Sequence, residues 1–166
     1  MGGVFSRQKQ TVVINGNSGM IPFIESIKQN FPQVTPQIGF SVQYIQIQGI
    51  NLVPLVLPMG EKIKPLWKVY YECSPVILLY FDNDEPDLTS DFIEELEYYT
   101  NSDVKNEKPI IVFVKSPCEI IEDATELLHK FHLGNINARR VIIKHIHDFS
   151  FGEINAHFIW IIANYL

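Results

Sequence analysis

Two runs of apolar residues, VILLYF at 76–81 and IIVFV at 110–114, restrict the kind of fold this chain can adopt. Neither run alternates with polar residues, so both predict strands that are buried on two faces, as in a parallel sheet. The stretch between them, 88–100, has apolar residues at helical spacing: Phe92, Ile93, Leu96 and Tyr99. Strand, amphipathic helix and buried strand together form the repeating unit of an α/β protein.

The same alternation extends toward both ends of the chain. Gln48-Gly49 separates two strand-like runs and predicts a tight hairpin. The other predictions are a strand at 11–14, a loop at 15–19, a helix to about 29, hairpin strands at 40–47 and 50–57, a helix at 124–131, a strand at 141–146 and a helix at 154–166. We therefore expect an α/β fold with helices on both faces of a mostly parallel six-stranded sheet. The hairpin supplies one antiparallel edge strand, and residues 11–166 form a single domain.

Composition excludes several classes of protein. Of the 166 residues, 46% are hydrophobic and 19% charged, which is enough to build a core and excludes a disordered segment. The formal net charge of −6 argues against a nucleic-acid binder. No apolar run approaches the roughly twenty residues that cross a bilayer, and the two cysteines, in no CxxC pair, indicate a reduced, cytosolic compartment.

Acidic residues are concentrated between 82 and 97, where no Lys or Arg occurs. We interpret them as a solvated helix face and its N-terminal turn. They are Asp82, Asp84, Glu85, Asp87, Asp91, Glu94, Glu95 and Glu97.

In doubly wound sheets, ligands bind beyond the carboxyl ends of the strands, and the loop at 15–19 occupies such a position. Its glycines could present backbone N–H groups to a phosphate. A nucleoside-triphosphate loop also needs a Lys and a Ser or Thr at its end, and this chain has Met20 and Ile21 there, followed by Pro22. Taken alone, the loop predicts an ordinary strand-to-helix turn.

Three further segments carry a family resemblance: TPQIGF at 35–40, GEKIKPLW at 60–67 and VY at 69–70. They resemble the switch regions of the ADP-ribosylation-factor (Arf) small GTPases, T-I-P-T-I-G-F and G-G-Q-D-K-I-R-P-L-W-R-H-Y, at the same spacing. The resemblance covers nearly the whole chain. It implies the small-GTPase fold and a place in GTP-regulated membrane traffic.

The resemblance also implies that most residues contacting nucleotide are replaced. Met20 and Ile21 stand where the family has its phosphate-loop Lys and magnesium-binding Thr, and Gln37 replaces the switch I Thr. VLPMG at 56–60 replaces D-V-G-G-Q; a shift by one residue would realign Gly60 and Glu61 but supply no Asp. The degenerate nucleotide positions are Asn15, Gly16, Asn17, Ser18, Gly19, Met20, Ile21, Gln37, Met59, Gly60, Lys115, Ser116 and Cys118.

The base-reading motifs are changed as well, because KSPC at 115–118 replaces N-K-x-D and HIHD at 145–148 replaces the third base-contact loop. Losing about four charge-assisted hydrogen bonds costs about 6–10 kcal/mol, or four to seven decades of affinity. We therefore interpret the chain as a degenerate Arf-like protein, a pseudo-GTPase with no catalytic residue, metal or cofactor. The alternative stays open: a GTP-binding switch in intracellular protein transport, with GTP or GDP and Mg²⁺ held by a rearranged site.

The N-terminus MGGVFS matches the myristoylation pattern M-G-x-x-x-[ST], so residues 1–10 are predicted to be a lipidation segment modified at Gly2. One acyl chain binds membranes only marginally, so stable anchoring needs a partner. The family's effector-binding aromatic triad aligns with Phe40, Leu55 and Tyr70; packing of Phe40 and Tyr70 on switch II is the other interpretation. We expect a monomer that binds protein effectors at the cytosolic face of endomembranes, the Golgi being one candidate, in vesicle-mediated transport.

Two further groups of polar residues could form minor sites. His145 and His147 would share one face of a strand beside Asp148, a spacing that suits a metal but lacks a third fixed ligand. Ser18 and Cys118 have no base at a readable spacing, so neither is expected to act as a nucleophile.

Overall fold

The computed structural model describes residues 10–16, 20–34, 44–56, 69, 72, 74–82, 92–94, 96–97, 108–115, 124–130 and 141–166. Its helices and strands are β1 (Thr11–Gly16), α1 (Ile21–Asn30), β2 (Gln33–Val34), β3 (Tyr44–Ile47), β4 (Ile50–Val56), β5 (Ile77–Asp82), β6 (Ile110–Lys115), α4 (Ala124–Lys130), β7 (Val141–Ile146) and α5 (Phe151–Tyr165). The strands form one seven-stranded sheet in the order β2-β3-β4-β1-β5-β6-β7.

The sheet is mostly parallel, as predicted. β1 pairs in parallel with β4 and β5, and β6 pairs in parallel with β5 and β7. β3 is antiparallel to both β4 and β2. The prediction of six strands with the antiparallel one at the edge misses β2, which pairs outside β3 and makes it second from the edge. A two-residue strand is too short to produce a periodic pattern in the sequence.

The hairpin predicted at Gln48-Gly49 is confirmed. Gln48 has a φ of 49° and Gly49 a φ of 84°, so both central residues lie in the left-handed region. Two positive φ angles are the signature of a type I′ turn, whose twist matches that of the flanking strands. Glycine adopts this conformation at no steric cost, whereas Gln48 pays a small one.

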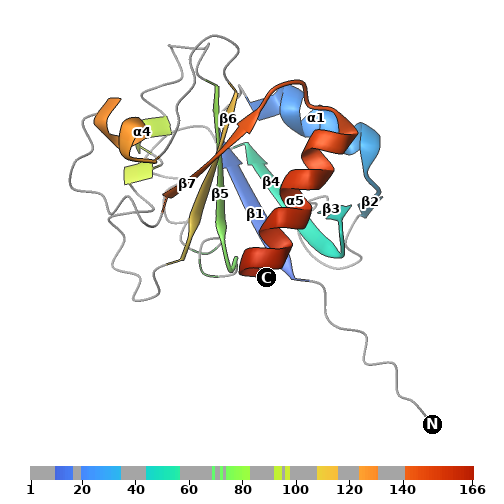
Figure 1. Cartoon of the computed structure of the whole chain (residues 1–166). Coiled ribbons are helices and arrows are strands. Elements are labelled where there is room, and N and C mark those ends of the chain that lie inside the picture. Colours follow the sequence, from blue (N-terminus) through green and yellow to red (C-terminus); the bar gives the residue numbers. More distant parts are fainter. Residues whose placement is uncertain are drawn as a thin grey trace.

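Successive side chains of a strand point to opposite sides of the sheet, so the buried strands present two apolar faces. Helices cover both of these faces. On one face, Ile14, Leu78 and Phe113 join Phe23 of α1 and Phe158 of α5 in one buried cluster. Figure 1 shows α1 and α5 side by side over this face. On the other face, the ring of Phe81 stacks on that of Phe92, with 4.5 Å between the centroids. α4, which follows β6 in the chain, places Leu128 in the interior.

Four predicted boundaries or environments are wrong. β1 continues through Asn15 and Gly16, which the sequence assigned to a loop. α5 begins at Phe151, three residues before the predicted start. His147 lies beyond the end of β7, so it does not share a strand face with His145. Asp82 is the last residue of β5 and is only 9% exposed, so it is not part of a solvated helix face.

Within the described part of the chain, every helix is too short or too polar to cross a lipid bilayer.

Candidate functional site

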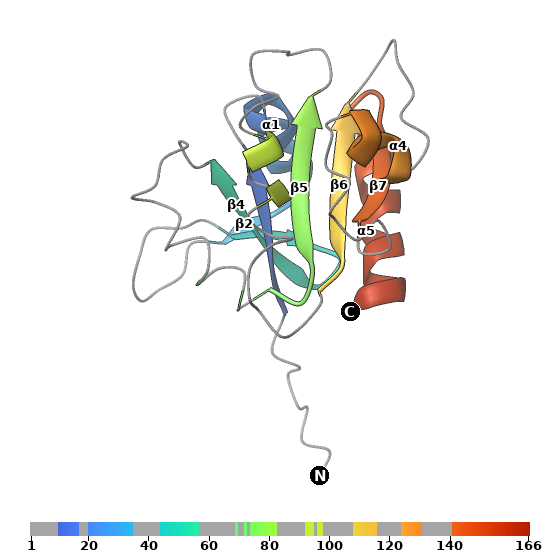
Figure 2. The same cartoon turned by 90° about the vertical axis from the view of Figure 1, so that its left-hand side faces the viewer.

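The parallel strands of the sheet all end at one edge, where the fold presents its loops for binding. In Figure 2 the arrowheads of β5 and β6 mark this edge. Gly16 ends β1, Asp82 ends β5 and Lys115 ends β6, while residues 147–150 connect β7 to α5. These are the described positions from which a ligand could be contacted.

Met20 immediately precedes α1, and its side chain is fully buried. It packs over Gly16: a Cβ atom built on that glycine would lie 3.0 Å from Met20 Sδ and 3.2 Å from Met20 Cβ. Met20 also belongs to the buried cluster that contains Phe23. An apolar side chain therefore packs between the end of β1 and the start of α1, and α1 starts without a side-chain cap.

Lys115 forms an ion pair with Asp82 on the neighbouring strand. The two residues face each other in the β5–β6 register, and 3.4 Å separates Lys115 Nζ from Asp82 Oδ2. The Asp82 side chain is 8% exposed, whereas that of Lys115 is 34% exposed. The contact pairs the Lys115 ammonium group with a buried carboxylate of the protein itself.

Phe149 connects three elements at this edge. Its ring lies 5.5 Å, centroid to centroid, from the ring of Phe23, and Lys115 Nζ lies 5.5 Å from its centroid. Its carbonyl oxygen accepts a hydrogen bond of 2.8 Å from Ser26 Oγ on α1. The backbone of Phe149 has a φ of 56°, a strained value for a bulky residue. The contacts of its ring and carbonyl hold it in this conformation.

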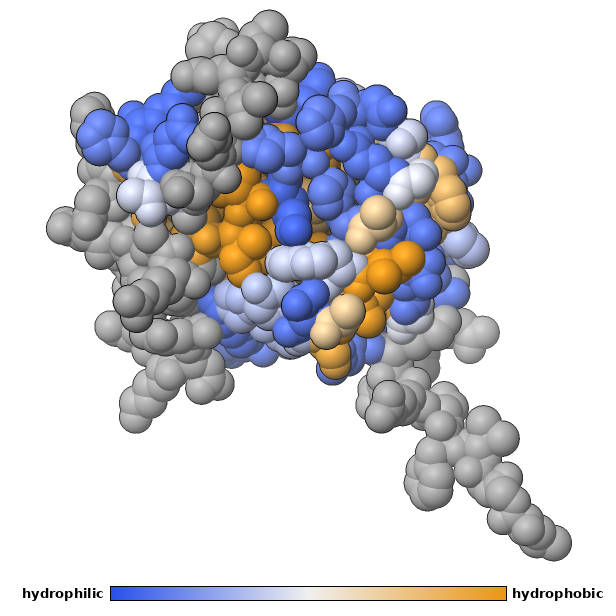
Figure 3. All heavy atoms as spheres, in the orientation of Figure 1, coloured by the Kyte–Doolittle hydropathy of each residue, from blue (hydrophilic) through white to orange (hydrophobic). Residues whose placement is uncertain are grey.

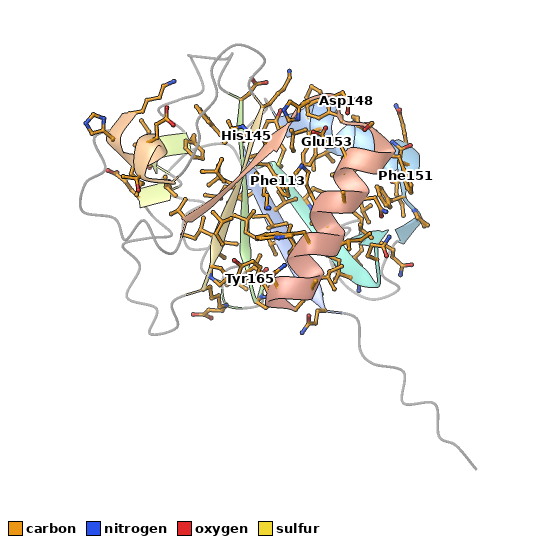
Figure 4. The ribbon with its side chains drawn as sticks, in the orientation of Figure 1. Phe113, His145, Asp148, Phe151, Glu153 and Tyr165 are labelled. Atoms are coloured by element: carbon orange, nitrogen blue, oxygen red, sulfur yellow. The ribbon has the colours of Figure 1, made fainter. Side chains whose placement is uncertain are left out.

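Glu153 closes the β7–α5 loop. Its carboxylate accepts hydrogen bonds from the backbone N–H of His147, at 2.9 and 3.1 Å, and from the N–H of Asp148, at 3.1 Å. His147 Nδ1 lies 2.7 Å from Glu153 Oε1. Ser150 caps α5 by accepting from the N–H of Glu153. Figure 4 shows Asp148 and Glu153 at this end of α5.

Two shifted pKa values reflect these contacts. The N–H of Ser150 donates to Asp148 Oδ1 at 2.8 Å and lowers the pKa of that carboxyl below its ordinary value. Burial lowers the pKa of His157, whose Nε2 lies 2.9 Å from the carbonyl oxygen of His145.

His147 is exposed and bonded to Glu153. Among the described residues, no three His, Cys, Asp or Glu side chains gather as metal ligands would.

The sequence of this chain can be compared with those of known protein families. The sequence model that describes the ADP-ribosylation factor family matches residues 8–165 of this chain. The chain belongs to the ADP-ribosylation factor family. The match spans almost the whole chain and confirms both the resemblance of the switch motifs and the predicted small-GTPase fold.

Members of the Arf family typically bind GTP or GDP with Mg²⁺. The described residues of this chain do not fit that ligand. Met20, which the switch-motif resemblance aligns with the phosphate-loop Lys, brings no charge and is buried. Lys115 is paired with Asp82, and Glu153 already accepts from the backbone N–H groups of the loop aligned with the third base-contact loop. A nucleotide would have to displace contacts the chain makes with itself.

The predicted site residues fall into two groups. Asn15, Gly16, Met20, Ile21 and Lys115 lie at the carboxyl edge, with Asn15 buried inside β1 and Ile21 46% exposed. Leu55 lies in β4, but its side chain is outside the described set. The others also lie outside the described residues: Gly2, Asn17, Ser18, Gly19, Gln37, Phe40, Met59, Gly60, Tyr70, Ser116 and Cys118.

Three residues that organise this edge are not among the predicted site residues: Asp82, Phe149 and Glu153. One of them had a readable signal, since Ser150 and Glu153 are spaced as in the S-x-x-E capping box that marks a helix start. The left-handed conformation of Phe149 has no such signal, because it depends on contacts with Phe23 and Ser26 that are more than a hundred residues away.

Proposed function

We propose that this Arf-family protein is a nucleotide-independent interaction module, a pseudo-GTPase that holds one conformation without GTP. The observation that carries the proposal is the burial of Met20 over Gly16. In an apolar setting of this kind a phosphate would lose its hydration without gaining a cation, which is strongly unfavourable. The side chain at this position serves the core, where a nucleotide-binding family member has a charge.

Two further contacts support the same proposal. The Glu153 carboxylate carries a negative charge at the base-contact loop, and the Lys115–Asp82 pair spans the ends of two adjacent strands. Arf-family members typically bind GTP or GDP with Mg²⁺. In this chain Lys115 and the Glu153 carboxylate are bonded within the protein, which supports folding without a ligand.

The test is the nucleotide content of the freshly purified full chain. The protein is denatured, and guanine and adenine nucleotides in the supernatant are quantified per mole of chain by ion-exchange chromatography. We expect far less than one nucleotide per chain. Near-stoichiometric GDP or GTP would overturn the proposal and establish a working switch.

Thermal unfolding with 1 mM GTP or GDP and Mg²⁺ extends this test to weak binding. A site with a Kd of about 10 µM would add about 2.7 kcal/mol of stability at that concentration. For a domain of this size, such a gain raises Tm by several degrees. We expect no rise in Tm with either nucleotide.

The second candidate function is a GTP-binding switch with a rearranged site. The observation that favours it is the family match over residues 8–165, because the family's ordinary role is nucleotide-regulated. It predicts bound nucleotide and a Mg²⁺-dependent rise in Tm, the reverse of both results above.

We further propose that the protein acts in vesicle-mediated transport as a peripheral protein on the cytosolic face of endomembranes, the Golgi being the first to examine. Support comes from family membership, since Arf proteins typically bind membranes and effectors. Gly2 is the proposed acylation site, and Phe40, Leu55 and Tyr70 the proposed effector surface. Coexpression with an N-myristoyltransferase should increase the mass of the wild type by one acyl group and leave Gly2→Ala unchanged.

The effector surface has its own test, which uses partner recovery by the purified, acylated chain. Phe40→Ala and Tyr70→Ala should each abolish recovery of the partner without lowering Tm. Recovery equal to that of the wild type would remove this surface from the proposal.

A further inference from the structure

The last turn of α5 lies at the same end of the molecule as the start of β1. Figure 1 and Figure 2 show this arrangement from two directions, and Val12 of β1 belongs to the same buried cluster as Ile161 of α5. The residues that precede β1 include Gly2, the proposed acylation site. They therefore join the folded domain beside the end of α5.

The short N-terminal segment limits how far the folded domain can lie from a membrane that takes up the acyl group. Residues 2–10 precede β1, and nine residues of fully extended chain span at most about 30 Å. A single acyl chain gives only marginal membrane binding. A second lipid contact at the nearby end of the domain would raise the affinity, and the end of α5 is placed to make it.

The surface at this end is aromatic and apolar. Trp160, Tyr165 and Leu166 are only partly buried, and Ala163 is exposed. The rings of Trp160 and Tyr165 meet edge to face, with 5.6 Å between their centroids. Figure 3 shows hydrophobic residues over α5 as far as its C-terminal end, where Figure 4 places Tyr165. Trp and Tyr are enriched where a bilayer meets water, because their rings are apolar and their N–H or O–H groups are polar. We call these four residues the α5 end patch.

A cation lies beside the aromatic pair. Lys144 Nζ, on β7, lies 3.4 Å from the centroid of the Trp160 ring. Among the described residues, no carboxylate pairs with the Lys144 ammonium group. Asp82, Asp148 and Glu153 lie at the opposite edge of the sheet, where β5 ends and α5 begins. In a chain with a net charge of −6, the end that carries Lys144 therefore suits the negative surface of a cytoplasmic leaflet better than the opposite edge does.

We propose that the α5 end patch, together with Lys144, binds the surface of a membrane that contains anionic lipids and so supplies the second contact that one acyl chain needs. This inference rests on the proposed acylation of Gly2. The two attachments act on the same molecule, so the second one forms at a high effective concentration once the first has formed. In this orientation the carboxyl edge of the sheet points away from the membrane.

Fluorescence of Trp160 tests the contact. The chain has two tryptophans, so Trp160 is the only one in a Trp67→Phe background. The acylated protein is mixed with vesicles of phosphatidylcholine and phosphatidylserine in which the phosphatidylcholine carries bromine on its acyl chains. Bromine quenches tryptophan only at close range, so Trp160 emission should fall relative to vesicles without bromine. Equal emission from protein bound to both kinds of vesicle would overturn the proposal.

A fold control accompanies this measurement. Circular dichroism and an unchanged Tm establish that Trp67→Phe is folded. If it is not folded, the quenching of the wild type is compared with that of Trp160→Phe, which should lose most of it.

Vesicle sedimentation with two charge variants tests which end of α5 meets the membrane. Ala163→Glu adds a negative charge to the α5 end patch and should weaken binding of the acylated chain to the phosphatidylserine vesicles about fivefold. Gly152→Glu is the matched control, because it adds the same charge at the other end of the helix, where a Cβ atom would meet nothing within 4 Å. It should bind as the wild type does. Equal losses in the two variants would contradict the proposed orientation.

Lys144→Gln tests the part played by anionic lipid. It should weaken binding to vesicles that contain phosphatidylserine about fivefold and leave binding to pure phosphatidylcholine unchanged. Unchanged binding to both kinds of vesicle would remove Lys144 from the proposed surface.

The membrane role and the α5 end patch fail in different ways. An acylated chain that binds no vesicle overturns both. An acylated chain that binds without quenching of Trp160, and with Ala163→Glu equal to Gly152→Glu, is held by its lipid alone and overturns only the patch. If Gly2 is not acylated, an N-terminal hexahistidine segment and nickel-chelating lipids supply the tether. The same quenching of Trp160 is then expected, and its absence overturns the patch.

Discussion

Helices α1 and α5 lie side by side and begin at the same edge of the sheet, yet they begin in opposite ways. α1 follows Met20, has no side-chain cap and has no acidic residue in its first turn. α5 follows Ser150, whose side chain accepts from the N–H of Glu153, and Glu153 in turn accepts from the preceding loop. One start is fixed by apolar burial and the other by a polar network.

The difference shows two physical ways in which a chain can fill space and satisfy N–H groups at the edge of the sheet where relatives bind a ligand. At the start of α1, an uncharged side chain takes over space and gains the free energy of burial. At the start of α5, a carboxylate supplies from within the chain the acceptors that the loop N–H groups need. The apolar packing at the start of α1 cannot be removed without damage to the core. The hydrogen bonds at the start of α5 can be weakened by one isosteric substitution.

Of the substitutions that test this comparison, Met20→Lys should change the free energy of unfolding most. It places a charge at a fully buried position, which should lower the free energy of unfolding by about 3 kcal/mol. Ile21→Lys is the control, because Ile21 is 46% exposed and its substitution should change stability by less than about 0.5 kcal/mol. Urea denaturation measures both. If Met20→Lys were as stable as wild type and bound Mg²⁺-GTP, the α1 start would be a nucleotide site after all.

Glu153→Gln should have the next largest effect. The amide keeps one acceptor oxygen but loses the charge and the second acceptor for the N–H groups of His147 and Asp148. We expect a loss of about 1–2 kcal/mol in urea denaturation. Glu25→Gln serves as control, since the exposed Glu25–Lys28 pair should contribute about 0.5 kcal/mol or less. Equal effects of the two substitutions would mean that the loop closes without Glu153.

Ser150→Ala isolates the cap from the carboxylate. Loss of an N-cap hydroxyl costs about 1 kcal/mol, whereas Ser150→Gly should cost only a few tenths. Chemical denaturation of the two variants under the same conditions shows which of them is the less stable. A Gly variant less stable than the Ala variant would show that backbone freedom, and not the cap, controls the start of α5.

The smallest effect concerns pH. Burial lowers the pKa of His157, so the folded state binds its proton less readily than the unfolded state does. Stability should therefore fall as pH decreases below the ordinary value of 6.5, and this contribution is absent at higher pH. Glu153, Lys144 and His147 act on the same imidazole, and each does so less than burial does.

His157→Gln, whose amide can still donate to the carbonyl of His145, should reduce the fall in stability between pH 7.5 and 5.5. His129→Gln, at an exposed position of α4, should leave it unchanged. The measurement is urea denaturation at both pH values. The same slope in both variants would assign the pH dependence to other groups.

Much of the fold could be predicted because its signals are local. The buried strands at 76–81 and 110–114 and the hairpin at 48–49 depend on neighbouring residues, and the structure has them within one residue. The candidate site was less predictable. That Met20 is not a lysine is plain in the sequence, but its packing over Gly16 is a tertiary contact. The Lys115–Asp82 pair depends on strand register, which no local pattern near residue 82 reports.

The position of β1 has a consequence for how the chain acquires its structure. This first strand lies in the interior of the sheet, between β4 and β5, and its Val12 and Ile14 belong to the same buried cluster as Phe158 and Ile161 of α5. β1 thus depends for its cover on a helix that lies more than a hundred residues later in the sequence. Such distant pairings form slowly and leave apolar surface exposed until they do.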